Sequence, residues 1–153
     1  MVRSEPLLRK DNQENSMIQT KIGQIQCNIA AQNLPFYKEL FAFVGWKTWV
    51  DAPDLLGIAQ DDVTSLWFSG NAKDVRNDYD GPGMNHLALR VSSQGDVDQM
   101  ANYLRQQNIP TLFNTPRHRP DFSPDADHTY YQVMFESPDR ILFEVVYIGP
   151  LAK

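Results

Sequence analysis

Hydrophobic and polar residues alternate in two well-separated stretches of the chain, and a period of two is typical of a β-strand with one buried face. In the first stretch, the apolar positions are Ile25, Cys27 and Ile29. In the second stretch, they are Leu87, Leu89 and Val91. We therefore expect two strands, each with an apolar face and a polar face.

The same order of elements is expected after each of these strands. Apolar residues recur at helical spacing over 34–44, where Gly45 should end the helix, and again over 96–108, where Asp96 is the expected cap. Short strands are then expected at 47–50, 55–59 and 63–68, and again at 111–113, 130–135 and 141–147. Strand, helix and three strands thus occur twice.

This repetition predicts an α+β fold made of two βαβββ modules. Module one covers 20–70, a polar, glycine-rich linker covers 71–82, and module two covers 83–148, within a single domain over 18–150. Residues 1–17 are polar and have no regular period, so we expect a disordered leader there. A chain of 153 residues leaves no room for a second independent domain.

Each helix should cover the apolar face of its sheet, which leaves polar side chains on the opposite face. Gln24 and His86 occupy the same position in the two repeated strands, and Arg90 follows on the same face as His86. A polar face of an antiparallel sheet often simply meets water. The alternation alone therefore leaves open whether this face is a functional site.

Composition narrows the possible partners. The formal net charge of -5 provides no basic field for nucleic acid, and no apolar run of about 18 residues exists to cross a membrane. The single cysteine, Cys27, excludes an internal disulfide and is interpreted as a small buried hydrophobe. The first residues lack the apolar core of a secretory signal, so we expect a cytoplasmic protein.

Three segments resemble the vicinal oxygen chelate superfamily, which contains glyoxalases, bleomycin-resistance proteins and extradiol dioxygenases. They are the strand GMNHLALRV, the helix FYKELFAFVGW and the hairpin YYQVMFESPDRILFEVVY. In that family a hairpin of the form F-x-D-P-D-G-x-x-x-E ends in a metal-binding glutamate; here Arg140 replaces the glycine. The resemblance covers 22–147 and implies a U-shaped mixed sheet around a cavity that holds a divalent metal.

The resemblance also implies the metal ligands. His86 and Glu144 match the ligands of module two, and Gln24 matches the ligand on the first strand of module one. The fourth ligand of isomerase-type members, a glutamate on the last strand of module one, has no counterpart in VTSLWFSG. An imidazole and a carboxylate can still share one cation, such as Zn, Ni, Mn or Fe, with open positions for substrate oxygens.

Several other side chains are candidates for the same cavity. His128 could act with Glu144 in catalysis as a proton shuttle. The expected substrate-binding residues are Arg90, Tyr130, Gln132 and Trp67. His118 lies in the proline-rich stretch PRHRPDF, which is either a lid over the site or a mobile surface loop.

Two functions follow from these expectations. The first is a metal-dependent enzyme acting on a small substrate chelated through neighbouring oxygens. Lyase or isomerase chemistry ranks above ring-cleaving dioxygenation, because one firm histidine leaves a two-histidine iron site incomplete unless His128 contributes. The alternative is a metal-free small-molecule or antibiotic binding protein similar to the bleomycin-resistance proteins. In either case the resemblance implies a homodimer.

Overall fold

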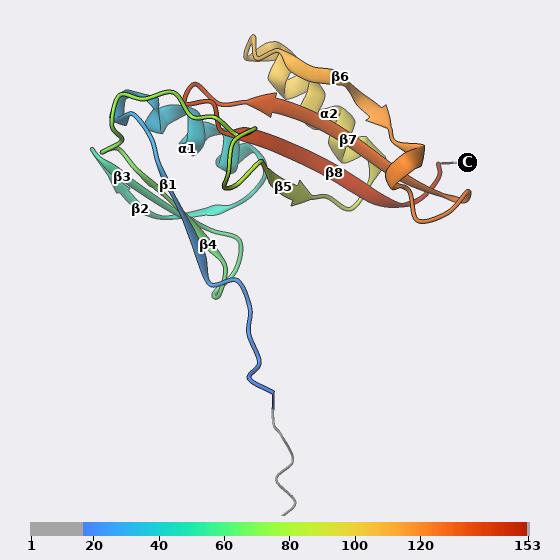
Figure 1. Cartoon of the computed structure of the whole chain (residues 1–153), viewed down its shortest axis with the longest axis horizontal. Helices are drawn as coiled ribbons and strands as arrows, with labels where there is room; N and C mark the ends of the chain where they lie inside the picture. The colour runs from blue at the N-terminus through green and yellow to red at the C-terminus, as the bar shows by residue number, and fades with distance from the viewer. Residues whose placement is uncertain (1–16, 153) are drawn as a thin grey trace, which may run out of the picture.

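The computed structural model describes residues 17–152, and the predicted leader lies outside this range except for Met17. Two four-stranded sheets, each covered by one helix, make up the molecule (Figure 1). They are formed by consecutive halves of the chain, and each half has the order strand, helix, three strands. The α+β fold of two βαβββ modules is therefore confirmed.

Module one forms a sheet in the order β1-β4-β3-β2. Strands β1 and β4 run parallel, and the other neighbours are antiparallel. A short 3-10 turn, Ala31–Asn33, leads from β1 into the helix. The elements are β1 (Gln24–Asn28), α1 (Leu34–Phe43), β2 (Lys47–Ala52), β3 (Leu55–Ala59) and β4 (Ser65–Ser69).

Module two repeats this arrangement in the order β5-β8-β7-β6, again with one parallel pair, β5 and β8. The register repeats as well, because Ile25 lies opposite Leu66 in module one and Leu87 lies opposite Phe143 in module two. The elements are β5 (Leu87–Arg90), α2 (Gln94–Gln106), β6 (Thr111–His118), the 3-10 turn Pro120–Phe122, β7 (His128–Glu136) and β8 (Leu142–Pro150).

A shared core joins the helix-covered faces of the two sheets. Tyr37 of α1 stacks on Phe68 of β4, and Phe41 contacts Phe143 of β8 edge-on. Cys27 is buried in this core, and burial raises the pKa of its thiol, as expected for a small hydrophobe rather than a nucleophile. One hydrophobic core thus includes residues of both modules.

The β7–β8 hairpin ties module two to the beginning of α1. Its Asp139 carboxylate accepts a hydrogen bond from the Ala30 backbone at 2.8 Å and lies 2.7 Å from the Tyr37 hydroxyl. Arg140 takes a left-handed conformation, with φ 55°, at the position where the resemblance expects glycine. Arg140 therefore takes the left-handed backbone conformation that glycine adopts easily.

Two local expectations need correction. The cap of α2 is Ser93, whose hydroxyl accepts a hydrogen bond from the Asp96 backbone at 3.1 Å, so Asp96 lies inside the first turn. Strand β6 continues to His118, so part of PRHRPDF belongs to the sheet instead of a loop. The end of α1 agrees with expectation, because Gly45 follows it with φ 83°.

In the described part of the chain, no helix is long and apolar enough to cross a membrane. The cytoplasmic location stays a prediction.

Candidate functional site

Glu144 is a charged residue in a buried position of β8. Its neighbours Phe143 and Val145 point into the helix-covered core, so Glu144 points to the opposite face of the sheet. It is nevertheless only 1% exposed. A carboxylate in such a position requires hydrogen-bond donors around it.

Three side chains of module two surround the carboxylate, and two of them, Tyr130 and Gln132, donate hydrogen bonds to it. His86 Nε2 lies 2.9 Å from Glu144 Oε2, and the Tyr130 hydroxyl donates to Glu144 Oε1 at 2.5 Å. The third is the Gln132 side-chain amide, whose nitrogen donates to Oε1 at 3.0 Å when the amide is oriented by its hydrogen-bonding partners. Burial and then the bond to Glu144 raise the pKa of Tyr130, which keeps its hydroxyl a donor.

Arg119 extends this cluster beyond Gln132. Its Nη1 donates to the Gln132 oxygen at 3.2 Å, while Nε and Nη2 donate to Asp121 at 3.1 and 2.8 Å. The guanidinium also lies 4.3 Å from the centre of the Phe122 ring. The hydrogen bonds with Asp121 raise the pKa of Arg119 and lower that of Asp121, so both groups are charged at neutral pH.

The imidazole of His86 is oriented by a neighbouring amide. Its Nδ1 lies 2.7 Å from Asn85 Oδ1, and Asn85 Nδ2 donates to the Tyr79 carbonyl at 2.9 Å. That second bond fixes Asn85 Oδ1 as an acceptor, so Nδ1 of His86 carries a hydrogen. The other nitrogen, Nε2, is left to face Glu144.

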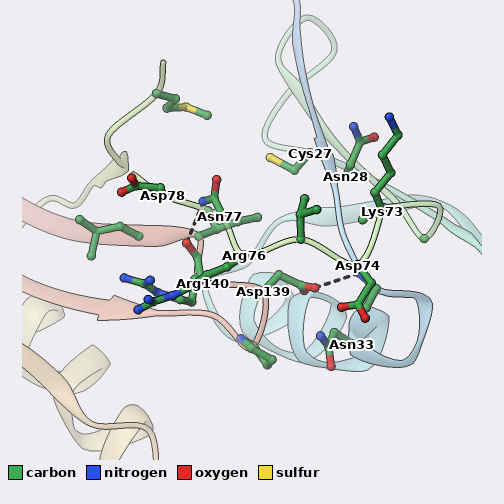
Figure 2. A pocket seen from close by; sticks show the side chains of 18 of the residues that line it. Cys27, Asn28, Asn33, Lys73, Asp74, Arg76, Asn77, Asp78, Asp139 and Arg140 are labelled. Atoms are coloured by element: carbon green, nitrogen blue, oxygen red, sulfur yellow. Dashed lines mark hydrogen bonds between the residues drawn. The ribbon is translucent and has the colours of Figure 1, made fainter. Parts of the chain in front are cut away.

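A wide cavity of about 1240 Å³ reaches His86 from the linker side. The end of β1, the linker between the modules and the β7–β8 hairpin line it, as does the stretch from Met84 to Leu87. Figure 2 shows the charged side chains of this cavity, among them Lys73, Arg76 and Arg140. His86 thus lies between this open space and the buried Glu144.

The structure does not bring every expected residue to this pair. Gln24 lies on β1 opposite Ser65 and is exposed; within residues 17–152 it is not among the hydrogen-bond partners of Glu144 or His86. His128 bonds instead to Asp125 at 2.6 Å. It is six positions along β7 from Met134, which pairs with Glu144, or about 20 Å along the strand.

Within residues 17–152, neither Arg90 nor Trp67 forms a hydrogen bond with the His86–Glu144 pair. Arg90 is exposed at the end of β5 and donates to the Ile148 carbonyl at 3.0 Å. The indole of Trp67 lies against Gly57, where an added Cβ would meet it at 2.6 Å. By the repeated register, Trp67 holds in module one the position that Glu144 holds in module two. An aromatic side chain thus occupies the register position in module one that corresponds to Glu144.

Sequence reasoning missed Arg119 as part of the cluster, and also Asn85. Both lie outside the alternating strand positions that pointed to the site, and neither carries a motif. The only available signal for Asn85 was its place directly before His86. For Arg119, the only signal was its place between His118 and a proline.

The His86–Glu144 pair fits two positions of a divalent metal site. Two ligands about 2.1 Å from one cation and at right angles to each other lie about 3 Å apart, which agrees with the observed 2.9 Å between Nε2 and Oε2. Within the described residues, however, no group of three or more His, Cys, Asp or Glu side chains is placed to hold a metal. A further protein ligand, if required, must be an uncharged side chain or come from elsewhere.

Neither a protein-family model nor a curated protein matches this chain. Solved structures do match its fold. A candidate glyoxalase from Bacillus halodurans has a TM-score of 0.70 at 22% identity, with 84% of this chain and 96% of that chain covered. The lactoylglutathione lyase of Agrobacterium tumefaciens has a TM-score of 0.56 at 17% identity, covering 84% and 94%.

An antibiotic binding protein from a Streptomyces species matches at a TM-score of 0.56 and 20% identity, covering 87% of this chain and 99% of that chain. The three similar structures therefore include both an enzyme and a binding protein. At these identities the likeness concerns the fold. The chain has the fold of the glyoxalase/bleomycin resistance/dioxygenase proteins, as the sequence resemblance predicted.

Proposed function

We propose that this protein is a divalent-metal-dependent enzyme acting on a small molecule that carries two neighbouring oxygens, with His86 and Glu144 as ligands. The observation that supports this most strongly is the 2.9 Å spacing of Nε2 and Oε2. The orientation of His86 adds to it, because a metal-binding histidine usually donates its other ring N–H to an oxygen acceptor. Asn85 Oδ1 is in that position here.

In this proposal the chain's own residues hold the ligand pair and the substrate. Tyr130 and Gln132 occupy Oε1 of Glu144, which leaves Oε2 to face His86. A bound divalent cation would polarise the substrate oxygens and stabilise an oxyanion. Substrate would enter from the cavity beside His86, and a single histidine at the pair favours lyase or isomerase chemistry over ring cleavage.

The third protein ligand in this proposal is Gln24, supplied by a second copy of the chain in a homodimer. Among the strands that the structure describes, β1 and β5 each end their sheet and pair with one neighbour, and edge strands of this kind are commonly covered. A Gln24 carboxamide can donate an oxygen to a metal, although less strongly than a carboxylate.

A metal-free binding protein is the second candidate. Trp67 at the position equivalent to Glu144 makes the module-one half of the site aromatic instead of acidic, and a flat indole suits the recognition of an apolar or aromatic ligand. The similarity to an antibiotic binding protein agrees with this alternative.

Metal analysis of protein purified without chelators separates the two candidates. We expect bound divalent metal in the wild type, lost in His86→Ala. The matched control is His128→Ala, because His128 is equally exposed, at 38% against 36% for His86, and also pairs with a carboxylate. Metal content should be unchanged in that variant. Lyase activity is then assayed with the hemithioacetal of methylglyoxal and glutathione, with and without added Ni²⁺ or Zn²⁺.

Wild-type protein that takes up no Zn²⁺, Ni²⁺, Mn²⁺ or Fe²⁺ at micromolar concentration would contradict the enzyme proposal. Saturable binding of bleomycin to the same protein, weakened by Trp67→Ala, would then favour the metal-free binding protein.

A further inference from the structure

We propose that Arg119 is a positioning residue, which fixes the side-chain amide of Gln132 and through it the presentation of the Glu144 carboxylate. The effect on metal binding rests on the function proposed above, whereas the positioning itself concerns only residues of this chain. Arg119 contacts neither His86 nor Glu144 by a hydrogen bond. Its influence must therefore pass through Gln132 or through its charge.

Gln132 is a buried amide between two opposite charges. It is 2% exposed, with its nitrogen 3.0 Å from Glu144 Oε1 and its oxygen 3.2 Å from Arg119 Nη1. Turning the amide by half a rotation would place its oxygen against the carboxylate and its NH₂ group against the guanidinium. Both contacts would be repulsive, so the two charges together determine the amide orientation.

Arg119 is itself held rigidly. Two hydrogen bonds to Asp121 and the Phe122 ring hold the guanidinium, which leaves the side chain only 20% exposed. The Arg119 backbone N–H donates to the Tyr130 carbonyl at 2.7 Å. Ser123 Oγ bonds both to the Arg119 carbonyl and to the Tyr130 N–H. The segment after β6 is thus hydrogen-bonded to the strand that carries Gln132.

The fixed amide restricts Glu144 to one free oxygen. Oε1 already accepts hydrogen bonds from Tyr130 and Gln132, and a carboxylate oxygen has two lone pairs. Only Oε2 is then presented beside His86. If the amide turned, Oε1 would lose a donor and the carboxylate could rotate away from His86. Partners that orient a metal ligand commonly contribute about 10- to 100-fold to metal affinity.

Positioning and charge make opposite predictions for Arg119. A guanidinium near a cation site repels the cation, so removing its charge should raise metal affinity in any background. Losing the amide orientation should instead lower the affinity, and only while Gln132 is present. A double-mutant cycle separates the two effects.

The experiment uses four full-length proteins: wild type, Arg119→Met, Gln132→Leu and the double variant. Co²⁺ is titrated into each and followed by calorimetry and by its visible absorption. We expect Arg119→Met to weaken Co²⁺ binding about 10- to 100-fold when Gln132 is present, and to change it by less than about twofold in the Gln132→Leu background. An equal effect in both backgrounds, or stronger binding in Arg119→Met, would overturn the proposal.

A second measurement does not depend on metal. The side-chain NH₂ of Gln132, followed by nitrogen-15 NMR, should exchange slowly with solvent in the wild type and faster in Arg119→Met. Arg119→Lys, which keeps a donor and a charge, should restore much of the protection. Unchanged exchange in Arg119→Met would refute the positioning role. If wild-type protein binds no Co²⁺, the enzyme proposal fails while this measurement still decides the role of Arg119.

Discussion

At the scale of single residues, the main feature is a carboxyl group in a buried position of the sheet. Leaving such a group without partners would cost several kcal/mol. Glu144 reduces this cost through two donors, Tyr130 and Gln132, while the His86 imidazole faces its other oxygen. Because a buried carboxylate needs its remaining lone pairs satisfied wherever it occurs, these donors account for its burial.

Substituting Glu144→Gln tests whether this carboxylate is a metal ligand. The amide has the same size and keeps an oxygen toward Tyr130, so the fold should survive, while the loss of charge should reduce Zn²⁺ affinity more than the roughly 10- to 100-fold lost with a ligand's hydrogen-bonding partner. Calorimetric titration and thermal melting measure the two effects. Leu89→Ala serves as the control, because Leu89 lies on the helix-covered face of the same module. It should lower the free energy of unfolding by about 2 kcal/mol and leave metal affinity unchanged. Metal affinity unaltered in Glu144→Gln would make the carboxylate a bystander.

The sequence could predict that His86, Glu144, Tyr130 and Gln132 share one site, but not that Arg119 and Asn85 join them. His86 and Glu144 stand out because strand alternation places both opposite the apolar face, and the hairpin motif marks the glutamate. Arg119 reaches the site only because its segment folds back along β7, and no local pattern encodes that contact. His128 shares its alternation with Tyr130, yet it lies too far along the strand to reach the pair. Periodicity gives the face of a side chain, but it does not give its distance along the strand.

At the scale of elements, the beginning of α2 shows how two polar residues compete for one role. Ser93 has extended backbone angles and its hydroxyl bonds to the Asp96 N–H, which is the geometry of a cap. Asp96 then lies in the first turn, where its charge interacts with the helix dipole. The sequence allowed either residue to be the cap.

Ser93→Ala should therefore destabilise the protein by about 1 kcal/mol, because one backbone donor at the helix end loses its partner. Asp96→Ala should cost less, about 0.3 to 1 kcal/mol, and its effect should decrease in high salt. Urea denaturation at low and high ionic strength measures both. If Asp96→Ala lowered the free energy of unfolding more than Ser93→Ala, and equally at low and high salt, Asp96 would be the cap.

Strand β7 and helix α2 are linked by the Tyr131 hydroxyl, which donates to Asp98 at 2.7 Å. Burial, and then this bond, raise the pKa of Tyr131 from 10 to about 12. The pKa of Tyr131 is higher in the folded protein than in the unfolded chain. Its contribution to the free energy of unfolding is therefore fully present below pH 10 and is lost as the pH rises toward 12. The urea midpoint should fall over that range, and it should fall less steeply in Tyr131→Phe. Equal slopes in the two proteins would contradict this assignment.

The strands were predictable where alternation is regular and less so where it breaks. The bounds of β3 agree with expectation, since 55–59 is apolar and bordered by turn residues. Strand β6 was expected to end at 113 but continues to His118. Its pairing with β7 is irregular between Leu112 and Arg117, and Phe113 and Asn114 have φ values of 58° and 55°. An interrupted strand of this kind lacks the period of two on which the prediction depended.

At the scale of the whole molecule, the proposed metal ligands are divided between two sheets. His86 and Glu144 belong to module two, whereas Gln24 lies on the edge strand of module one and is exposed. The modules meet through their helix-covered faces and the β7–β8 hairpin (Figure 1). A second copy of the chain could bring its own module one to the polar face of module two, and two such sites would result from one symmetric dimer.

A mixing experiment tests this arrangement. Gln24→Ala and Glu144→Gln each damage one half of the site, and each variant alone should bind Zn²⁺ weakly. If sites are shared between chains, a dimer containing one chain of each variant has one site with both defects and one site with none. Coexpressed, differently tagged chains, purified as the mixed dimer, should therefore recover one strong Zn²⁺ site per dimer by calorimetry. If each site is built within one chain, both sites of the mixed dimer remain damaged and no strong binding returns.

Sedimentation provides the control, because the mixed species must be a dimer at the micromolar concentrations used for titration. Gln60→Ala serves as the matched substitution, since Gln60 is an exposed glutamine of module one that follows β3 and makes no side-chain bond to the pair. A mixed dimer of Gln60→Ala and Glu144→Gln chains should have one strong Zn²⁺ site in either arrangement. If sites are shared, the strong site combines Glu144 of the Gln60→Ala chain with Gln24 of the other chain. If each site lies within one chain, the strong site is the intact one of the Gln60→Ala chain. Recovery with Gln60→Ala but not with Gln24→Ala would therefore place Gln24 in the same chain's site, and a purely monomeric protein would rule out sharing altogether.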